Sequence, residues 1–457
     1  MESFEVQGLW WLPEYADHQV PGVLSWDPAR GGTLKLVGQL LPIVLLDNVL
    51  SDGQVQKYRD HDPEPGGTYP VVHGLDGKSH YTLCNAFQMT RRDWSLERSV
   101  ETVRVNSVLT GAFFSDPDID VDTAVFRMRD LAGWVGASGV EVTHPLIRGD
   151  GDEFAMVSAK HLPEIVVPTA GPRPILSHRL EVLAPAIDST RIEQDWVLRV
   201  TQDDLAILPT FVAVASDFQD LVSIATGRTA EFRSLVLYHP ELPRRSSAGE
   251  PMGNAREDLI YHCQWANRVN HEADGPKALV PMHRSEMYFT FDHVGVEATG
   301  RWLDVAADYR TELGRAMATR YSSGYLEDRI MNVCAALESF DKHRRDVKEA
   351  YYVDRIEACV DLAGEVFRDW IIEDGREWSK RVKILRNDLA HHRDRFRLDG
   401  SLGGSLIAEQ LFWLFVICLF RVAQFPEAVF EAIAGHREWN WLQEQVRESL
   451  ALSDVAT

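Results

Sequence analysis

The chain of 457 residues has few cysteines, and none lies in a motif that indicates a disulfide or a metal site. Cys84, Cys263, Cys334, Cys359 and Cys418 are odd in number and widely separated, and no Cys-x-x-Cys pair occurs. This spacing argues against a disulfide framework and against a tetrathiolate zinc site. It favours a reducing compartment, so we expect a cytoplasmic protein.

Long apolar runs and nucleotide-binding motifs are also missing. The most apolar run, LFWLFVICLF at 411–420, is about half the length that a membrane span needs. The N-terminus, MESFEVQGLWWLPEY, has no basic segment followed by an apolar one, so no secretory signal is expected. Neither a phosphate-binding GxxxxGK[ST] loop, a GxGxxG turn after a strand nor a Gly-x-Ser-x-Gly elbow is present. We therefore expect no membrane association and no cofactor.

Positive charge is scarce, with a formal net charge of −22. A global negative field repels phosphate, which argues against a protein coated in nucleic acid. One segment differs: residues 376–397, REWSKRVKILRNDLAHHRDRFR, hold eight Lys or Arg against three acidic residues, a balance of +5. The segment is either an ordinary solvated helix end or a local site for phosphate.

The 45% hydrophobic and 25% charged residues are typical of a globular chain of two or three domains. Up to about residue 200, apolar stretches rich in β-branched and aromatic residues alternate with Pro, Gly and Asp clusters. These stretches are 33–46, 81–89, 99–114 and 191–200. They predict an antiparallel sandwich or barrel-like module, with a short helix around 130–136 and with Trp10 and Trp11 in the core.

A helix is expected near 210–226 and a loop or linker at 239–254. From about residue 297 the apolar period becomes helical and Gly and Pro are rare. The predicted helices are 297–318, 325–344, 347–372, 377–392, 403–424 and 427–450. We therefore predict an α+β multidomain chain, in which a mainly antiparallel β module at 1–295, with a subdivision near 205–255, precedes an all-α bundle at 296–457.

The stretch KILRNDLAHHRD, at 383–394, places an arginine five residues before a histidine inside the predicted helix 377–392. On a straight helix Arg386 and His391 would lie about 140° apart, whereas Asn387 and His391 share a face. Arg386 and His391 can act together if the helix is irregular at its last turn, or if two copies of it meet in a dimer. The ordinary alternative is that both residues only neutralise the carbonyl end of a helix.

These residue types suit the metal-free cleavage of RNA. A guanidinium binds phosphate oxygens in a fixed fork and stays charged, and an imidazole transfers protons near neutral pH. Arg386 would stabilise charge on phosphorus while His391 moves protons, and Asn387 would orient the imidazole or the phosphate. A two-fold dimer would supply both proton transfers.

We considered a metal at His391 and His392 with Asp388 and Asp394. Adjacent histidines point to different sides of a helix and no HExxH spacing occurs, so no metal is expected there. His262, Cys263 and His283 are more simply explained as a buried cysteine and surface histidines than as part of a zinc site.

RNDLAH, at 386–391, resembles the Arg-x4–6-His signature of HEPN domains, which are all-α bundles that often act as dimeric ribonucleases. The segment NVCAALESFDKH, at 332–343, resembles the earlier HEPN helix, which often carries an acidic residue facing the motif. The resemblance implies that Arg386 and His391 are catalytic and that Asn387 supports them. Glu338, or else Asp341, would be the facing acid. Around the motif, the contacts expected with RNA are those of Lys380, Lys383, His392 and Arg393.

The segment GLWWLPEYADHQVPGVLSWDPARGGTLKLVGQL, at 8–40, resembles the start of the ApeA-type N-terminal domain. In bacterial abortive-infection factors directed against phage, that domain is fused to an ApeA-like HEPN domain. The resemblance implies a homodimeric, metal-independent endoribonuclease that cleaves host RNA, with tRNA as one candidate, to 2′,3′-cyclic phosphate ends. The N-terminal module would sense a phage trigger or regulate the nuclease. The alternative is a non-catalytic module that binds RNA or a partner protein.

Overall fold

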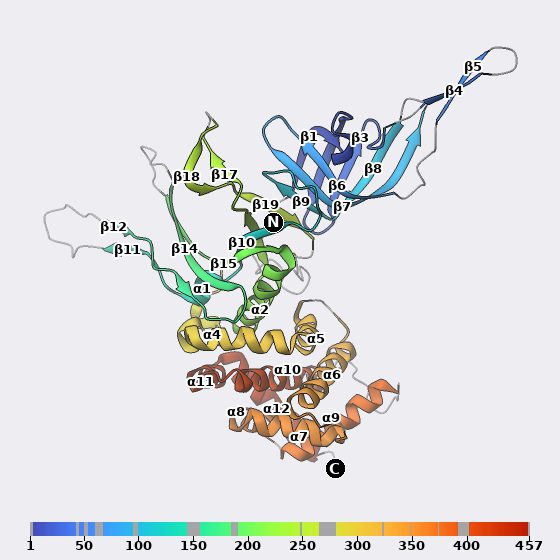
Figure 1. Ribbon diagram of the computed structural model, residues 1–457. Coiled ribbons are helices and arrows are strands. Elements are labelled where there is room, and N and C mark those ends of the chain that lie inside the picture. The colour runs from blue at the N-terminus through green and yellow to red at the C-terminus, as the bar shows by residue number, and fades with distance from the viewer. Residues whose placement is uncertain are drawn as a thin grey trace, which may run out of the picture. The chain divides into compact units, whose positions relative to one another are not determined.

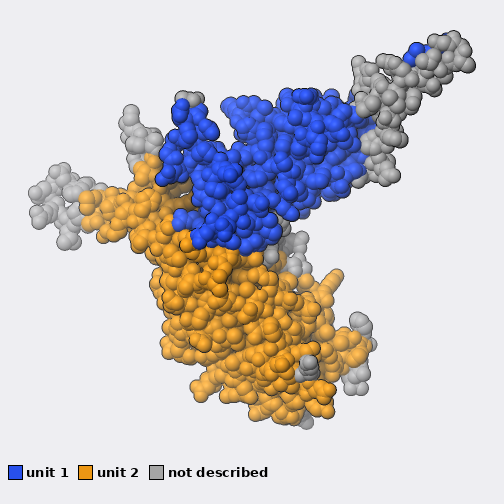
Figure 2. Space-filling model, viewed as in Figure 1, with its two compact units in different colours: residues 1–127, 199–212, 231–267 blue, residues 128–198, 213–230, 268–457 orange. Residues whose placement is uncertain are grey.

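The computed structural model describes most of the chain and divides it into two compact units that alternate along the sequence. The residues described are 3–42, 45–49, 54–59, 67–94, 99–143, 156–183, 191–246, 249–264, 280–321, 324–347, 349–372, 374–391 and 402–455. Unit 1 comprises residues 1–127, 199–212 and 231–267, and unit 2 comprises residues 128–198, 213–230 and 268–457 (Figure 2).

Six antiparallel strands of unit 1 form a closed ring. Their bounds are β1 (Phe4–Trp11), β2 (Val20–Asp27), β3 (Gly31–Leu36), β6 (Thr68–Leu75), β7 (His80–Asp93) and β8 (Ser99–Val105). The pairing runs β6-β1-β2-β3-β8-β7, and β7 pairs back with β6. Such closure leaves these strands without the unpaired edges that an open sheet exposes. The prediction of a barrel-like antiparallel module is confirmed.

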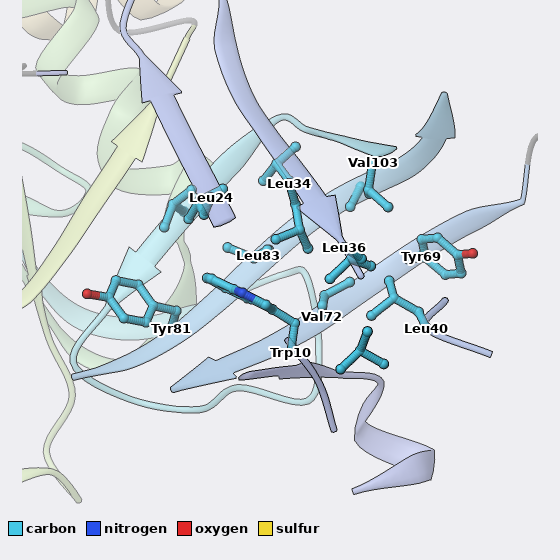
Figure 3. Close-up of a cluster of buried hydrophobic side chains, with 14 of the residues drawn as sticks. Trp10, Leu24, Leu34, Leu36, Leu40, Tyr69, Val72, Tyr81, Leu83 and Val103 are labelled. Atoms are coloured by element: carbon cyan, nitrogen blue, oxygen red, sulfur yellow. The ribbon is translucent and has the colours of Figure 1, made fainter. Parts of the chain in front are cut away.

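Large apolar side chains fill the inside of this barrel. Figure 3 shows the indole of Trp10 among Leu34, Val72 and Leu83, and all four side chains are fully buried. Gly74 lies directly across from Trp10 in the β1–β6 pair, and a Cβ there would come within 2.2 Å of the indole ring. Only glycine therefore leaves room for this tryptophan. The prediction that Trp10 and Trp11 belong to the core is confirmed.

Further strands of unit 1 extend from the barrel through β9 (Ser107–Thr110), which pairs with the first part of β7. The order continues with β19 (Leu259–Cys263), β16 (Phe232–Tyr238), β10 (Asp120–Met128) and β15 (Arg191–Ile207), of which residues 199–207 belong to unit 1. Two separate hairpins are β4 (Leu45–Val49) with β5 (Val55–Arg59), and β17 (Pro243–Arg245) with β18 (Pro251–Arg256). The loop predicted at 239–254 is therefore partly wrong. At the end of β18, Arg256 Nη1 donates a hydrogen bond to Asp122 Oδ2 at 2.6 Å, which ties the hairpin to β10.

Unit 2 begins with short strands and two helices. Both helices were predicted from the sequence. The strands are β11 (Val140–Thr143), β12 (Met156–Ala159), β13 (Ile165–Val166), β14 (Arg173–Leu183) and residues 191–198 of β15. The helices are α1 (Leu131–Val135) and α2 (Leu208–Thr226), whose residues from 213 onward belong to this unit. Asp217 of α2 accepts a hydrogen bond from Trp302 through its carbonyl at 2.8 Å and forms an ion pair with Arg310 at 2.7 Å.

The C-terminal region is helical, as predicted. Its helices are α4 (Phe291–Asp308), α5 (Arg310–Tyr321), α6 (Leu326–Arg345), α7 (Tyr352–Ala363), α8 (Glu365–Ile371), α9 (Gly375–Ala390), α10 (Leu402–Val422), α11 (Glu427–Gly435) and α12 (Arg437–Val455). Three predicted helices are each divided in two, at Tyr309, Gly364 and His436. At Gly364 a φ of 79° turns the chain out of the helical region, a conformation that glycine adopts without strain. The predicted domain boundary at 295/296 and the subdivision near 205–255 stay predictions.

Helix α10 is the central helix of the bundle. It packs against α4, α6, α7, α8 and α12, and it lies between α4 and α7 in Figure 1. Its segment Gly403–Val422 is the one described helix that is long and apolar enough to cross a membrane. Because 72% of that segment is buried inside the bundle, packing accounts for its apolar character, and no membrane protein is evident. The predicted α+β class, with a β module followed by helices, is confirmed.

Candidate functional site

Helix α9 carries the predicted motif and is held in the bundle along one face. The Asp374 side chain caps its start by accepting hydrogen bonds from the backbone N–H groups of Arg376 and Glu377, at 3.0 and 3.3 Å. Its buried residues begin with an adjacent pair and then recur every three positions, which turns one side toward α6 and α7. They are Trp378, Ser379, Val382, Leu385 and Asp388. The opposite face, which includes Lys380 and Lys383, stays exposed.

The Arg386 guanidinium is surrounded by groups from three helices. Nη2 lies 3.5 Å from Glu338 Oε2 of α6, and Nη1 donates a hydrogen bond to Asn387 Oδ1 at 3.3 Å. The central carbon of the guanidinium lies 5.3 Å from the centre of the Tyr352 ring, at the first residue of α7. The Arg386 side chain remains 35% exposed and that of Glu338 41% exposed. The pair is therefore long and solvated, and the guanidinium can reach a ligand.

Tyr352 and Cys334 form a neutral layer beside this arginine. Burial raises the pKa of the Tyr352 hydroxyl well above its ordinary value, and the nearby Cys334 raises it further. Burial also raises the pKa of the Cys334 thiol to about 11, although Arg386 opposes that rise. Both groups are therefore uncharged at neutral pH and do not neutralise Arg386. Sequence reasoning missed Tyr352; the tyrosine pair 351–352 near the start of the predicted helix 347–372 was its only signal.

His391 lies where α9 ends. The last helical residue is Ala390, and His391 follows as the C-terminal cap with φ −110° and ψ 11°. Its backbone N–H donates to the carbonyl of Asn387 at 3.1 Å, and its side chain is exposed. The motif thus crosses the end of the helix, where the angular spacing of a straight helix no longer applies. Among the described residues, no hydrogen bond or ion pair joins the His391 ring to the Arg386 guanidinium.

Asp341 has a different environment from Glu338, although both lie on α6. The Asp341 carboxylate is fully buried and faces three guanidinium groups: Arg345 at 2.6 Å, Arg355 at 3.4 Å and Arg344 at 3.6 Å. Charge pairing of this kind holds α6 to the start of α7. The structure therefore places Asp341 in the packing of the bundle, and Glu338 is the acid that faces Arg386.

Comparison with known proteins agrees with the family resemblance predicted for the N-terminal part of the chain. The family model of ApeA N-terminal domain 1 matches residues 5–302, well over half of the chain. This chain belongs to the ApeA N-terminal domain 1 family. Membership points to a role in anti-phage defence. No curated protein and no solved structure matches the chain.

The ApeA family match covers the segment 8–40, whose resemblance is thereby confirmed, and it also covers 120–290, where the sequence offered no motif. It ends within α4, ahead of α6 and α9. The HEPN resemblance of RNDLAH and of the α6 segment therefore stays a prediction.

The remaining predicted residues of this ApeA-family chain lie around α9. Lys383 is exposed, and Lys380 Nζ forms an exposed ion pair with Glu377 at 2.6 Å. His392 and Arg393 lie outside the described residues, as does Asp394. Asp388 is buried, so it is not presented to a surface metal. Within the described ranges, no three His, Cys, Asp or Glu residues gather in a way that could hold a metal ion.

Proposed function

We propose that this ApeA-family chain is an anti-phage endoribonuclease whose site contains Arg386 and His391. The observation that supports it best is the environment of the Arg386 guanidinium. This group is partly exposed, lies beside a neutral aromatic ring and is paired only loosely, at 3.5 Å, with Glu338. A phosphate can replace such a partner, because a planar guanidinium binds phosphate oxygens in pairs.

In the proposed reaction, the ribose 2′-oxygen attacks the neighbouring phosphorus and the 5′-oxygen leaves. His391 removes the proton of the 2′-hydroxyl, and Arg386 stabilises the negative charge that builds on the phosphate oxygens. Asn387, whose Oδ1 accepts from Arg386, fixes the direction of the guanidinium fork. The products are a 2′,3′-cyclic phosphate and a free 5′-hydroxyl, and no metal is required.

A homodimer supplies the second proton transfer. An imidazole that has just accepted a proton from the 2′-hydroxyl can protonate the leaving 5′-oxygen only if that oxygen lies within its reach. His391 of the partner subunit provides a separate acid on the other side of the phosphate. The exposed side of α9 is suited to this pairing because it carries an apolar side chain, Ile384, which is 52% exposed. The dimer thus forms through the HEPN-like helices.

The substrate is host RNA, with tRNA as one candidate. Lys380, Lys383, His392 and Arg393 belong to the segment 376–397, the +5 island in a chain of net charge −22. Such a local excess attracts a polyanion to one place while the rest of the surface repels it. The N-terminal β module senses a phage trigger or regulates the nuclease, and cleavage takes place in the cytoplasm.

The test compares full-length wild type with the His391→Ala and Arg386→Ala variants. Each protein is incubated with total bacterial RNA in EDTA, and the ends of the fragments are mapped. Wild type should give discrete fragments ending in 2′,3′-cyclic phosphate. Each variant should be slower by about 100-fold or more, the usual effect of losing a proton-transfer group or a charge-stabilising donor. Arg437→Ala, which removes an exposed arginine of α12, is the matched control and should cleave normally.

The same fragment ends are mapped in RNA from phage-infected cells that express these proteins. This second measurement detects cleavage that requires a phage trigger. Cleavage by wild type and by both site variants would contradict the assignment of Arg386 and His391. RNA binding without cleavage in either setting would support the non-catalytic module instead. In that case the losses should spread over Lys380, Lys383 and Arg393.

A further inference from the structure

The ring of Tyr352 is held in place by two helices other than its own. Tyr352 is the first residue of α7, which packs against both α6 and α9. Its hydroxyl oxygen is buried beside the Cys334 thiol of α6, and its ring lies against Arg386 of α9. Because α6 and α9 both limit its rotation, the ring has a defined position beside the Arg386 guanidinium.

The polar contacts of Arg386 fix its direction only weakly. Nη1 donates to Asn387 Oδ1 at 3.3 Å, and Nη2 donates to the half-exposed Glu338 Oε2 at 3.5 Å. These contacts use two of the five N–H donors of a guanidinium, and the other three have no acceptor among the described residues. An arginine side chain loses much rotamer entropy when it is fixed, so two long hydrogen bonds do not hold it in one orientation.

The ring adds a third contact of a different kind. The central carbon of the guanidinium lies over the Tyr352 ring, 5.3 Å from its centre, within the range of about 6 Å over which a ring face attracts a cation. Burial holds the pKa of the Tyr352 hydroxyl well above its ordinary value, so the side chain is uncharged. It therefore attracts the guanidinium without neutralising it and without competing with a phosphate for the N–H donors. A carboxylate in the same place would do both.

We propose that Tyr352 is a positioning residue for the cleavage reaction, whose ring holds the Arg386 guanidinium in the orientation that receives the phosphate. The inference rests on the proposed function, because it explains how the same arginine is oriented before the phosphate arrives. Tyr352 acts through Arg386 and not by contact with the RNA. A donor that is already oriented stabilises the transition state without the cost of reorganisation during the reaction.

The experiment compares variants of Tyr352 in the full-length protein by the kcat and KM of RNA cleavage. Tyr352→Leu keeps an apolar side chain but removes the ring, so kcat should fall by about 2- to 30-fold, the range expected of one cation–π contact, and KM should change less. Tyr352→Phe keeps the ring and should restore the wild-type rate.

A third variant separates the attraction of the ring from its packing. Tyr352→3,4,5-trifluorophenylalanine has nearly the shape of the Phe variant, but its fluorine atoms withdraw the negative charge from the ring face that attracts a cation. It should therefore cleave more slowly than Tyr352→Phe at the same thermal stability. Equal rates of these two variants would mean that the ring only packs. Because both keep an aromatic ring, this comparison holds even if Tyr352→Leu does not fold.

Phe430→Leu is the matched control. The Phe430 ring of α11 lies under another arginine of the same bundle, Arg421 of α10, with 3.6 Å between the ring centre and the central carbon of the guanidinium. Arg421 is also paired with Glu427, at 2.9 Å, and none of these residues belongs to the candidate site. The variant loses a ring beneath an arginine, as Tyr352→Leu does, so its folded form should cleave RNA at the wild-type rate.

A second measurement reports on Arg386 whether or not the protein cleaves RNA. The rate at which phenylglyoxal modifies Arg386, followed by peptide mass spectrometry, should rise several-fold in Tyr352→Leu and stay unchanged in Tyr352→Phe. The exposed Arg437 is the internal standard.

The two measurements distinguish failure of the positioning role from failure of the nuclease. Wild-type cleavage by Tyr352→Leu and by the trifluoro variant would overturn the positioning role and leave the nuclease standing. An unchanged modification rate of Arg386 in Tyr352→Leu would overturn it as well. Conversely, a modification rate that depends on the ring, in a protein that cleaves no RNA with or without phage infection, would show that Tyr352 positions Arg386 and would refute the nuclease.

Discussion

The barrel of unit 1 and the helical bundle of unit 2 both bury a carboxylate, but they satisfy it in different ways. In the barrel, Glu101 accepts hydrogen bonds from uncharged donors: the Tyr69 hydroxyl at 2.7 Å, the Gln88 amide at 2.9 Å and the Leu40 backbone N–H at 2.9 Å. In the bundle, Asp341 faces the guanidinium groups of three arginines.

This difference bears on where a site can form. Two of the three donors to Glu101, Tyr69 and Gln88, lie on paired strands whose register fixes them, and no further ligand is needed to complete the set. In the bundle, arginine provides the charge, and arginine remains ionised in any environment. Asp341 and Glu338 lie three residues apart on α6, yet one is closed off by its partners and the other is open to solvent. A ligand can compete for the arginine only at Glu338, where the ion pair is incomplete.

The comparison predicts its largest effect at Asp341. Asp341→Ala leaves Arg345 and the buried Arg355 without their shared counter-ion, so the free energy of unfolding should fall by about 3–5 kcal/mol. Urea unfolding followed by circular dichroism measures this. Glu338→Ala, on the same helix, is the control and should lower the free energy of unfolding by less than about 1 kcal/mol. Equal effects of the two substitutions would erase the distinction.

Replacing the buried carboxylate of the barrel, Glu101, should lower the free energy of unfolding somewhat less. Glu101→Leu leaves the Tyr69 hydroxyl and the Leu40 N–H buried without an acceptor. At about 1–2 kcal/mol for each of these uncharged groups, we expect a loss of about 2–4 kcal/mol. Glu101→Gln keeps one oxygen acceptor and should lose about half as much. The same urea experiment decides, and a Gln variant as unstable as the Leu variant would show that the charge itself matters.

Acid should affect the two regions in different pH windows. Burial holds the pKa of His262, beside Phe4 in unit 1, at about 4, below the ordinary 6.5. The unfolded chain therefore binds a proton at this residue before the folded chain does, and stability falls by about 2–3 kcal/mol as the pH drops from 6.5 toward 4. His262→Phe should remove this dependence in thermal unfolding between pH 6.5 and 4.5. An unchanged pH profile would exclude His262 as its source.

In unit 2 the corresponding group is Glu409. Burial alone would raise the pKa of Glu409, but Arg320 and Arg329 outweigh it and hold that pKa below its ordinary 4.5. The stability from this carboxylate is fully present above pH 4.5 and is lost only below it. Hydrogen exchange resolved by segment should therefore show strand β19 loosening at a higher pH than α10. The opposite order would contradict both assignments.

The smallest effect on stability is expected at Glu338, where the effect on binding is the informative one. Glu338→Gln should change the free energy of unfolding by less than about 1 kcal/mol, because the pair with Arg386 is long and exposed. Affinity for a short 2′-O-methyl RNA, which cannot be cleaved because its 2′-oxygens are blocked, should rise several-fold, since a phosphate no longer competes with a carboxylate for Arg386. A fall in affinity would mean that Glu338 orients Arg386 for the RNA.

Much of the fold could be predicted from local pattern. Alternating apolar strands and punctuating Gly and Pro indicated the β module, and the helical period indicated the bundle. Helix breaks were harder: at Tyr309 and His436 the chain turns between two apolar patterns that continue in phase, so periodicity alone does not reveal the break. The hairpin of β17 and β18 contains Gly and Pro throughout its sequence, and its bond from Arg256 to Asp122 joins residues far apart in the chain.

The residues of the candidate site also differ in how far the sequence could predict them. Arg386, Asn387 and His391 are neighbours in sequence, so a short motif was enough to single them out. Glu338 came from the resemblance of α6. Tyr352 contacts Arg386 only because α7 packs against α9, and no spacing in the sequence reports that contact.

The alternation of the two units along the chain has a consequence for the order in which they can be completed during synthesis. The barrel ring needs nothing beyond β8, so it can close once residue 105 has emerged from the ribosome. Unit 1 as a whole must wait for residues 231–267, because β19 supplies the strand that pairs with β9. By then residues 128–198 and 213–230 of unit 2 have already emerged, while the helices that pack with them are still unmade. In the nascent protein these strands and α2 therefore remain unpacked until α4 and α5 have been synthesised. During this interval a chaperone would find apolar surface to bind.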